Sequence, residues 1–304
     1  MRRSLRPGWL GIAFAALVGV GAAKQVPLPA PVLAPVQGAE TWEYTHKADT
    51  LLDIAVRAGV GFIALSALNP GVDVWVPPEG VRLRLPSEYV LPDAPHTGIV
   101  INIPEMRLYD YTRDPNNPTV LPVAVGDIQD PTPIGDFKVG QKRVDPAWTV
   151  PESIRAERPD LPAIVAPGPD NPLGDRWLTL GTTSYGIHGT NNLWSIGREA
   201  THGCVRLYNA DMRVLFDRIP LGTPVRIVYQ RVKVGQRDGG VYVEAHGDYY
   251  DRQFDPLPAT LSRLVALDAL GLVDGGSIKE SEVQRVVSEA RGIPVRVGRL
   301  ERAP

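Results

Sequence analysis

The only cysteine in the chain, Cys204, stands in a stretch rich in histidine and glycine. His202 and Gly203 precede it directly, and His188-Gly189 lies 16 residues earlier, although the whole chain holds only five histidines. A free thiol has a pKa of about 8.5 and is only partly ionised at neutral pH, but a neighbouring histidine can take its proton. This combination of residues indicates nucleophilic acyl transfer through Cys204.

The spacing of these residues predicts how the backbone must hold them. A separation of 16 residues excludes contact between His188 and Cys204 on one helix, but it suits two strands joined by a loop at one end of a sheet. Gly189 and Gly203 permit tight backbone turns beside the reacting atoms. Backbone N–H groups near Gly203 and Cys204 can stabilise a tetrahedral oxyanion, and loss of one such donor typically costs about 3–4 kcal/mol of barrier.

Two other interpretations of this stretch stay open on the residues alone. His188, His202 and Cys204 are three possible zinc ligands, although nothing nearby supplies a clear fourth ligand or a general-base carboxylate. Cys204 can also be an inert buried thiol. The other three histidines, His46, His96 and His246, carry no motif and are expected at the surface or in loops.

The elements that must position the site are short strands. Residues 97–230 carry β-rich segments bounded by Pro and Gly turns, at 99–103, 107–111, 120–125, 135–139, 177–180, 185–188 and 225–229. One helix interrupts them after the cysteine, with Asn209 as its expected N-cap and apolar residues at helical spacing, Met212, Leu215, Phe216 and Ile219. The pattern predicts a mainly β domain, a sandwich or mixed barrel.

Smaller segments flank this domain. Residues 40–86 predict a strand ending at Tyr44, a helix capped by Asp49 or Thr50, a turn at 69–71 and a closing strand at 81–85. The extension 231–304 predicts a hairpin around 237–240 and two amphipathic helices, at about 258–270 and 279–291.

The N-terminus has the features of a secretory signal peptide. Three arginines precede an apolar run, and small residues follow it up to Ala23. We therefore expect cleavage after residues 1–23 and a periplasmic location, with an uncleaved membrane anchor as the alternative. Residues 24–39 hold five prolines and predict an extended linker.

The composition excludes several classes of protein. The chain has 304 residues, 43% of them apolar, and a net charge of −2, which does not indicate a nucleic-acid binder. One cysteine cannot form an internal disulfide, and no phosphate-binding loop or metal motif is evident. We expect no cofactor and no metal.

The stretch around Cys204 resembles the signature of the YkuD-type L,D-transpeptidase domain, in particular its ErfK/YbiS-like branch. The likeness covers about residues 40–247 and includes further segments at 126–137, 145–149, 166–172, 186–191 and 241–244. The module at 40–86 resembles a LysM module, carried by Tyr44, Asp49-Thr50-Leu51, Ile54-Ala55, Asn69-Pro70 and Leu85-Pro86. The resemblance implies a βααβ order and binding to the glycan of peptidoglycan, and a mere folding or docking role for this module stays open.

The resemblance implies a role for each matching residue. Cys204 is the nucleophile and His188 the base, with the second ring nitrogen of His188 oriented by a backbone carbonyl near Gly189. His202, Gly203 and Cys204 shape the oxyanion region. Arg206 departs from the broad pattern, which has Asn there, and can pair a substrate carboxylate, with a structural ion pair as the alternative. Asn191 and Trp148 are weaker candidates for substrate binding.

The resemblance also implies the reaction. Cys204 attacks the L-centre carbonyl of the third residue, diaminopimelate, of a peptidoglycan tetrapeptide stem, and D-Ala leaves. The acyl group then passes to an amine of an envelope protein such as an outer-membrane lipoprotein, to another stem, or to water. A peptidoglycan-binding structural protein without activity, and an envelope cysteine peptidase or amidase, are the alternatives.

Overall fold

The computed structural model describes residues 33–301. The signal peptide expected over 1–23 and the first part of the expected linker, 24–32, lie outside the described residues. Within the described part, no single helix is long and apolar enough to cross a membrane; α1 and α2, bent by 113°, pass that test only as a pair.

The central sheet has eight strands in the order β15-β13-β12-β9-β16-β5-β6-β7. Their bounds are Val205–Arg206 (β15), Gly186–His188 (β13), Arg176–Leu180 (β12), Gly135–Val144 (β9), Pro224–Val228 (β16), Ile99–Asn102 (β5), Arg107–Asp110 (β6) and Thr119–Pro122 (β7). Each predicted strand is therefore present, and the mainly β prediction is confirmed. The short strands β8 (Val125–Gly126) and β14 (Glu199–Thr201) form a separate parallel pair beside it.

Helix α4 (Asn209–Arg218) packs on this sheet through the four predicted apolar residues. The predicted cap is wrong: Tyr208 holds the N-cap position without a side-chain cap, and Asn209 is the first helical residue. The reason is that the Asn209 amide bonds another loop, as described below.

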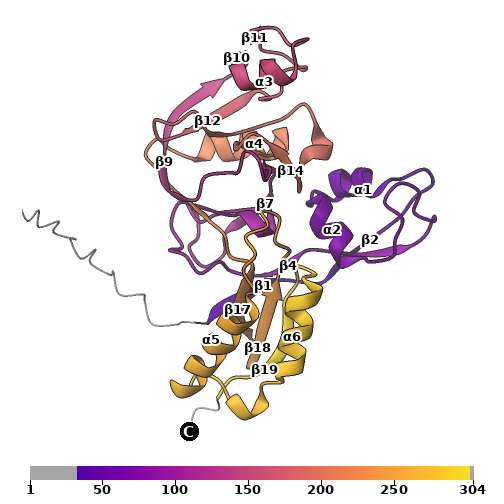
Figure 1. Ribbon diagram of the computed structural model, residues 1–304, viewed down its shortest axis with the longest axis vertical. Helices are drawn as coiled ribbons and strands as arrows, with labels where there is room; N and C mark the ends of the chain where they lie inside the picture. Colours follow the sequence, from indigo (N-terminus) through magenta and orange to yellow (C-terminus); the bar gives the residue numbers. More distant parts are fainter. Residues whose placement is uncertain (1–32, 302–304) are drawn as a thin grey trace, which may run out of the picture. The chain divides into compact units, whose positions relative to one another are not determined.

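A hairpin extends from the far end of β9 (Figure 1). Strands β10 (Trp148–Thr149) and β11 (Ile164–Val165) pair antiparallel, with the short helix α3 (Glu152–Glu157) between them.

The segment 40–86 has the predicted order of strand, helix, helix, strand. These are β2 (Thr41–Tyr44), α1 (Leu51–Ala58), α2 (Phe62–Leu68) and β3 (Arg82–Leu85), and β2 pairs with β3. Thr50 caps α1 in a capping box with Asp53, as one of the two predicted caps.

This module is hydrogen-bonded to the part of the chain that carries Cys204. The N–H groups of Phe62 and Ile63 donate to the carbonyls of Ile196 and Gly197 at 3.3 and 3.1 Å. A Cβ on Gly197 would lie 2.2 Å from the Cα of Gly61, so Gly197 is needed for this close approach.

The linker prediction fails over its second half, because Ala34–Gly38 forms strand β1. Strand β1 pairs parallel with β17 (Val232–Arg237) and antiparallel with β4 (Glu88–Val90). Val36 is buried there, and the Pro35 carbonyl accepts from the N–H of Leu91. A proline-rich composition therefore did not prevent pairing, since proline keeps its acceptor oxygen.

The extension has the predicted hairpin and helices. Strands β17, β18 (Gly240–Ala245) and β19 (Val295–Arg299) form a sheet against which α5 (Leu257–Ala269) and α6 (Glu280–Glu289) lie (Figure 1). Their common core is aliphatic, with Val234, Val241, Val243, Leu264 and Leu267 among its members.

Three short 3-10 turns complete the described elements: Ile103–Glu105, Leu193–Ser195 and Gly275–Ser277.

The three histidines outside the Cys204 stretch were predicted to lie at the surface or in loops. His46 is exposed and His96 stacks on Tyr111. His246 lies in a loop directly after β18, as predicted, but it is buried: it is only 5% exposed and contacts Glu244 Oε1 at 2.8 Å. It belongs to a buried charged cluster that joins β6 to the extension, because Arg107 of β6 and Lys233 of β17 both contact Glu244.

Candidate active site

The register of β13 and β15 brings the predicted site residues together. The two strands are parallel, with Ile187 opposite Val205 and His188 opposite Arg206. Ile187 and Val205 are fully buried in the core. Because side chains alternate along a strand, His188 and Arg206 project from the other face, and Cys204 precedes β15 on the same side. The pairing of these two short strands thus brings residues that are 16 positions apart in the sequence to the same face of the sheet.

A tight turn presents Cys204. The Thr201 hydroxyl donates to the Cys204 carbonyl at 2.6 Å, which closes the turn 201–204. Gly203 has a φ of 91°, and a Cβ there would lie 2.4 Å from the Tyr185 ring. The backbone hydrogen bonds within residues 33–301 include none donated by Gly203 or Cys204. Both N–H groups are therefore available to an oxyanion.

His188 is buried and held in one orientation. Its Nδ1 lies 2.6 Å from the Gly189 carbonyl, and its ring stacks on Trp177 with centroids 5.3 Å apart. The carbonyl fixes the proton on Nδ1, which leaves Nε2 as the basic nitrogen. This matches the orientation that the sequence resemblance implies for His188.

The environment shifts both titrating groups toward their neutral forms. Burial, and then the positive charge of Arg206, lower the pKa of His188 to about 3. Burial raises the pKa of the Cys204 thiol, against smaller lowering effects from the Gly186 N–H and Arg206. Each group is therefore neutral at rest, Cys204 as a thiol and His188 as an imidazole that can accept a proton.

Asn209 positions the loop that follows His188, and the sequence interpretation missed this role. Its Oδ1 accepts from the Thr190 N–H at 2.9 Å and its Nδ2 donates to the Thr190 carbonyl at 2.8 Å. A Cβ on Gly189 would lie 2.0 Å from this Oδ1. Asn209 thus fixes the peptide next to the carbonyl that orients His188, and Gly189 makes room for it.

Arg206 has no carboxylate partner in the described part of the chain. No carboxylate lies within ion-pair distance of it among residues 33–301, and its Nε is buried without a hydrogen-bond partner. The alternative of a structural ion pair is therefore not supported. An unpaired, half-buried guanidinium next to a thiol and an imidazole is suited to an anionic group of a ligand.

His202 points away from the buried pair. Its Nε2 lies 3.6 Å from Glu157 at the end of α3 and 3.9 Å from Asp130, and its side chain is 40% exposed. Only the backbone of His202 belongs to the turn before Cys204.

Of the two weaker candidates, Trp148 lies in strand β10 of the hairpin and Asn191 in the loop after β13. Trp148 pairs with Val165 across β10 and β11, and the Asn191 amide donates to the Asp170 carbonyl at 2.8 Å. Asn191 and Asn209 both line a pocket of about 400 Å³. In the described chain, no hydrogen bond joins either candidate to Cys204.

The zinc interpretation is not supported by the described geometry. The one group of potential ligand atoms that gathers within residues 33–301 is Glu105, Glu244 and His246, not the residues around Cys204. In that group the Lys233 ammonium already lies 2.7 Å from Glu105 and 3.2 Å from Glu244. It supplies the positive charge that two buried carboxylates require.

Known proteins are similar to this chain over the same region and beyond. The model of the YkuD family, described as an L,D-transpeptidase catalytic domain, matches residues 96–227. "Probable L,D-transpeptidase YbiS" of Escherichia coli (strain K12) is 38% identical over 254 residues, covering 80% of this chain and 81% of that protein. "Probable L,D-transpeptidase ErfK/SrfK" of the same strain is 34% identical, covering 83% of each chain.

A solved L,D-transpeptidase from Mycobacterium tuberculosis is a more distant match. It is 15% identical with a TM-score of 0.34, covering 67% of this chain and 96% of that one. The two curated relatives cover enough of both chains to decide membership. The chain belongs to the L,D-transpeptidases with a YkuD catalytic domain, in the group of ErfK and YbiS.

Proposed function

We propose that this L,D-transpeptidase works by two-step acyl transfer on Cys204. The thiol attacks the L-centre carbonyl of diaminopimelate in a tetrapeptide stem, and His188 Nε2 takes the thiol proton. The bond to D-Ala breaks, His188 returns the proton to the leaving amine, and a thioester remains. An acceptor amine then attacks the thioester and restores the thiol. One amide is exchanged for another, so the reaction needs no nucleotide.

The observation that carries this proposal is the parallel pairing of β13 with β15. It sets His188 and Cys204 on one face, beside two N–H groups that have no backbone acceptor within 33–301. Such donors stabilise the tetrahedral intermediates of acyl transfer. Membership of the family implies peptidoglycan as the substrate.

Arg206 is proposed to bind a carboxylate of the donor stem. Its guanidinium has no acidic partner among the described residues, and a fork of N–H donors matches a carboxylate. Trp148 and Asn191 are proposed to line the substrate path. Asn191 lies in the loop that follows His188, and Trp148 lies in strand β10 of the hairpin. His202 is proposed to shape the oxyanion region through its backbone only.

The location and the acceptor are also proposals. A signal peptide over 1–23 would deliver the enzyme to the periplasm, where an amine of an envelope lipoprotein or of a second stem would accept the acyl group. The module at 40–86 is proposed to bind the glycan. Trp75 is 66% exposed and Val76 76% exposed on it, which suits a sugar face.

An exchange assay tests the proposal. The full chain is incubated with a disaccharide-tetrapeptide, alone, with a second stem, or with a lysine-containing peptide, and D-Ala and the products are quantified by mass spectrometry. We expect D-Ala release with an equal amount of exchanged product, and neither with Cys204→Ala. Cleavage of ordinary proteins without D-Ala release would instead favour a cysteine peptidase.

A further inference from the structure

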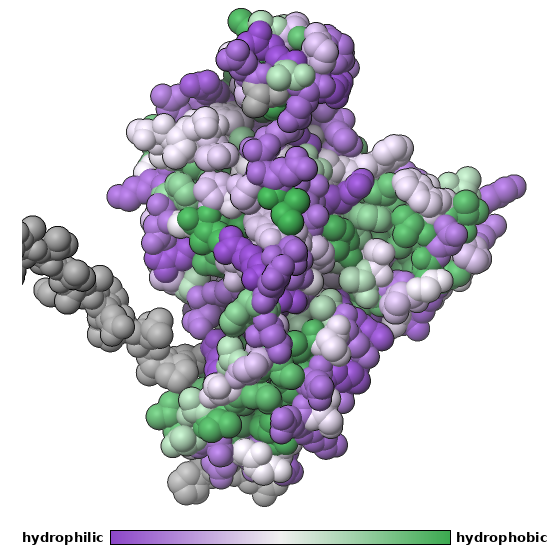
Figure 2. All heavy atoms as spheres, in the orientation of Figure 1, coloured by the Kyte–Doolittle hydropathy of each residue, from purple (hydrophilic) through white to green (hydrophobic). Residues whose placement is uncertain are grey.

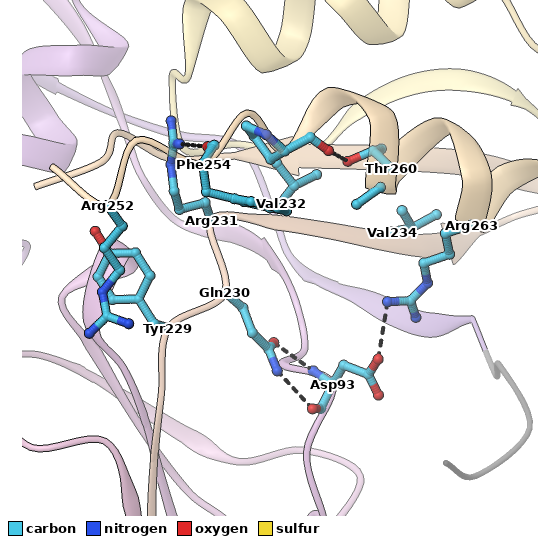
Figure 3. Close-up of a pocket in the computed structure, with 12 residues that line it drawn as sticks. Asp93, Tyr229, Gln230, Arg231, Val232, Val234, Arg252, Phe254, Thr260 and Arg263 are labelled. Atoms are coloured by element: carbon cyan, nitrogen blue, oxygen red, sulfur yellow. Dashed lines mark hydrogen bonds and ion pairs between the residues drawn. The ribbon is translucent and has the colours of Figure 1, made fainter. Parts of the chain in front are cut away.

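A second pocket lies where the catalytic sheet continues into the extension (Figure 3). Its volume is about 470 Å³, which falls in the range of roughly 300–1,000 Å³ usual for ligand sites. Val232 and Val234 of β17 form part of the wall, and Thr260 and Arg263 of α5 another part. None of its lining residues belongs to the Cys204 site.

The pocket holds one positive charge in excess. Arg231 pairs with Asp248 at 3.3 Å and Arg263 pairs with Asp93 at 3.0 Å. The third guanidinium, of Arg252, has no carboxylate within 4 Å in the described chain. It stacks over the Tyr229 ring, 4.6 Å from the centroid, which holds it at the pocket wall without neutralising it.

The segment 251–255 contributes the Arg252 guanidinium and the Phe254 ring to this pocket. Asp251 and Gln253 have φ values of 43° and 49°, which are uncommon for residues other than glycine. Between and after them stand Arg252 and Phe254, and Phe254 is 58% exposed although it lines the pocket. Figure 2 shows hydrophobic residues gathered around α5. Val265 of α5 and Leu270, directly after it, are exposed.

We propose that this pocket binds a peptidoglycan stem peptide, with a carboxylate of the peptide on Arg252 and its aliphatic part against Phe254 and Val232. The fork of N–H donors on the Arg252 guanidinium matches one carboxylate of the peptide. Val232, which is half-buried, and the exposed Phe254 ring offer an apolar surface that a free inorganic anion would not use. The inference rests on the proposed function, because that function supplies the stem peptide.

Binding at this pocket would hold a second stem on the same enzyme. The proposed active site engages one stem through Arg206, and the pocket engages another through Arg252. The extension would then add a peptidoglycan contact of its own, independent of the module at 40–86.

Methyl NMR on the full chain tests the inference. Cys204→Ala protein with labelled Val and Ile methyl groups is titrated with a free tetrapeptide containing diaminopimelate. Val232 and Val234 report the pocket, while Ile187 and Val205 report the active site. We expect saturable shifts at both places, with the pocket affinity about tenfold weaker in Arg252→Gln and in Phe254→Ala. Arg113→Gln, at an exposed arginine outside the pocket, is the matched control and should change neither.

The outcomes separate this inference from the proposed function. Shifts at Ile187 and Val205 alone would overturn the pocket assignment and leave the active site standing. Pocket shifts that are unchanged in Arg252→Gln, or that inorganic phosphate produces equally well, would also overturn it. Shifts at neither place would contradict both proposals for this peptide.

Discussion

At the residue scale, the account depends on a buried imidazole and a half-buried thiol that are both neutral at rest. His188 is held by the Gly189 carbonyl and the Trp177 ring, and Cys204 directly precedes the neighbouring strand β15. Burial disfavours the charged form of both, as a lowered pKa for the histidine and a raised one for the thiol. A preformed thiolate–imidazolium pair is therefore not the resting state.

This neutral pair predicts an unusual pH profile. The pKa of His188 is lowered to about 3, so the imidazole remains an unprotonated base well below its ordinary value of 6.5. We expect kcat/KM for D-Ala release to stay constant as the pH falls from 7.5 to 5. A loss of activity centred near pH 6.5 would mean that His188 titrates normally and that the neutral pair is wrong.

Asn209 is predicted to act as a positioning residue for His188. Asn209→Ala removes both hydrogen bonds to Thr190, and the carbonyl that orients His188 then loses its support. We expect kcat to fall roughly 10–100-fold with little change in KM, since a small misplacement of a base has that effect. Asn209→Asp keeps an acceptor for the Thr190 N–H and should recover part of the loss. If both variants lost kcat to the same extent and both also lost thermal stability, Asn209 would have a purely structural role.

At the element scale, local patterns were sufficient wherever partners are near in sequence. The hairpin of β17 and β18, the apolar face of α4 and the Thr50 cap all follow from short-range spacing, and each is present. The pairing of His188 with the Cys204 turn could also be anticipated, because it needs only one loop.

Other elements could not be predicted because their partners are distant. Strand β1 pairs with β17 about 200 residues away, and nothing in its proline-rich sequence signals that partner. Asn209 is a residue type typical of helix N-caps, but its side-chain amide is hydrogen-bonded to the backbone of Thr190. His246 lies in a loop as predicted, but its burial against Glu105 could not be predicted, because Glu105 is distant in the sequence.

The turn before Cys204 predicts an effect of Gly203→Ala. The methyl group would meet the Tyr185 ring in a backbone conformation that favours glycine, so the two N–H groups would move. Loss of such donors lowers kcat by roughly 10²–10³-fold, which the D-Ala assay measures. Gly222→Ala is the matched control: it has a φ of 81° with nothing within 4 Å of the added methyl, and should keep its activity.

At the scale of the whole molecule, a buried charged cluster joins the catalytic sheet to the extension. Lys233 contacts the carboxylates of Glu105 and Glu244, and Arg107 contacts both as well. Arg107 also donates to the Pro86 carbonyl at the end of the module. Two carboxylates face two cations, so the cluster is balanced only while all its members are present.

Lys233→Met is therefore predicted to destabilise the protein by about 3–5 kcal/mol, because it leaves an uncompensated charge buried. Denaturant unfolding measures this change. Lys47→Met, at an exposed lysine, is the control and should lie within about 0.5 kcal/mol of the wild type. A loss as small as that of the control would show that the cluster does not hold the extension in place.

The central claim is that Cys204 carries the acyl group, and intact mass spectrometry tests it most directly. The full chain and Cys204→Ala are each incubated with a disaccharide-tetrapeptide containing diaminopimelate, without an acceptor, and quenched in acid. The account predicts an adduct of the substrate minus D-Ala on the wild type only, with one D-Ala released per adduct. Reduced, folded wild-type protein that forms no adduct and releases no D-Ala would contradict it.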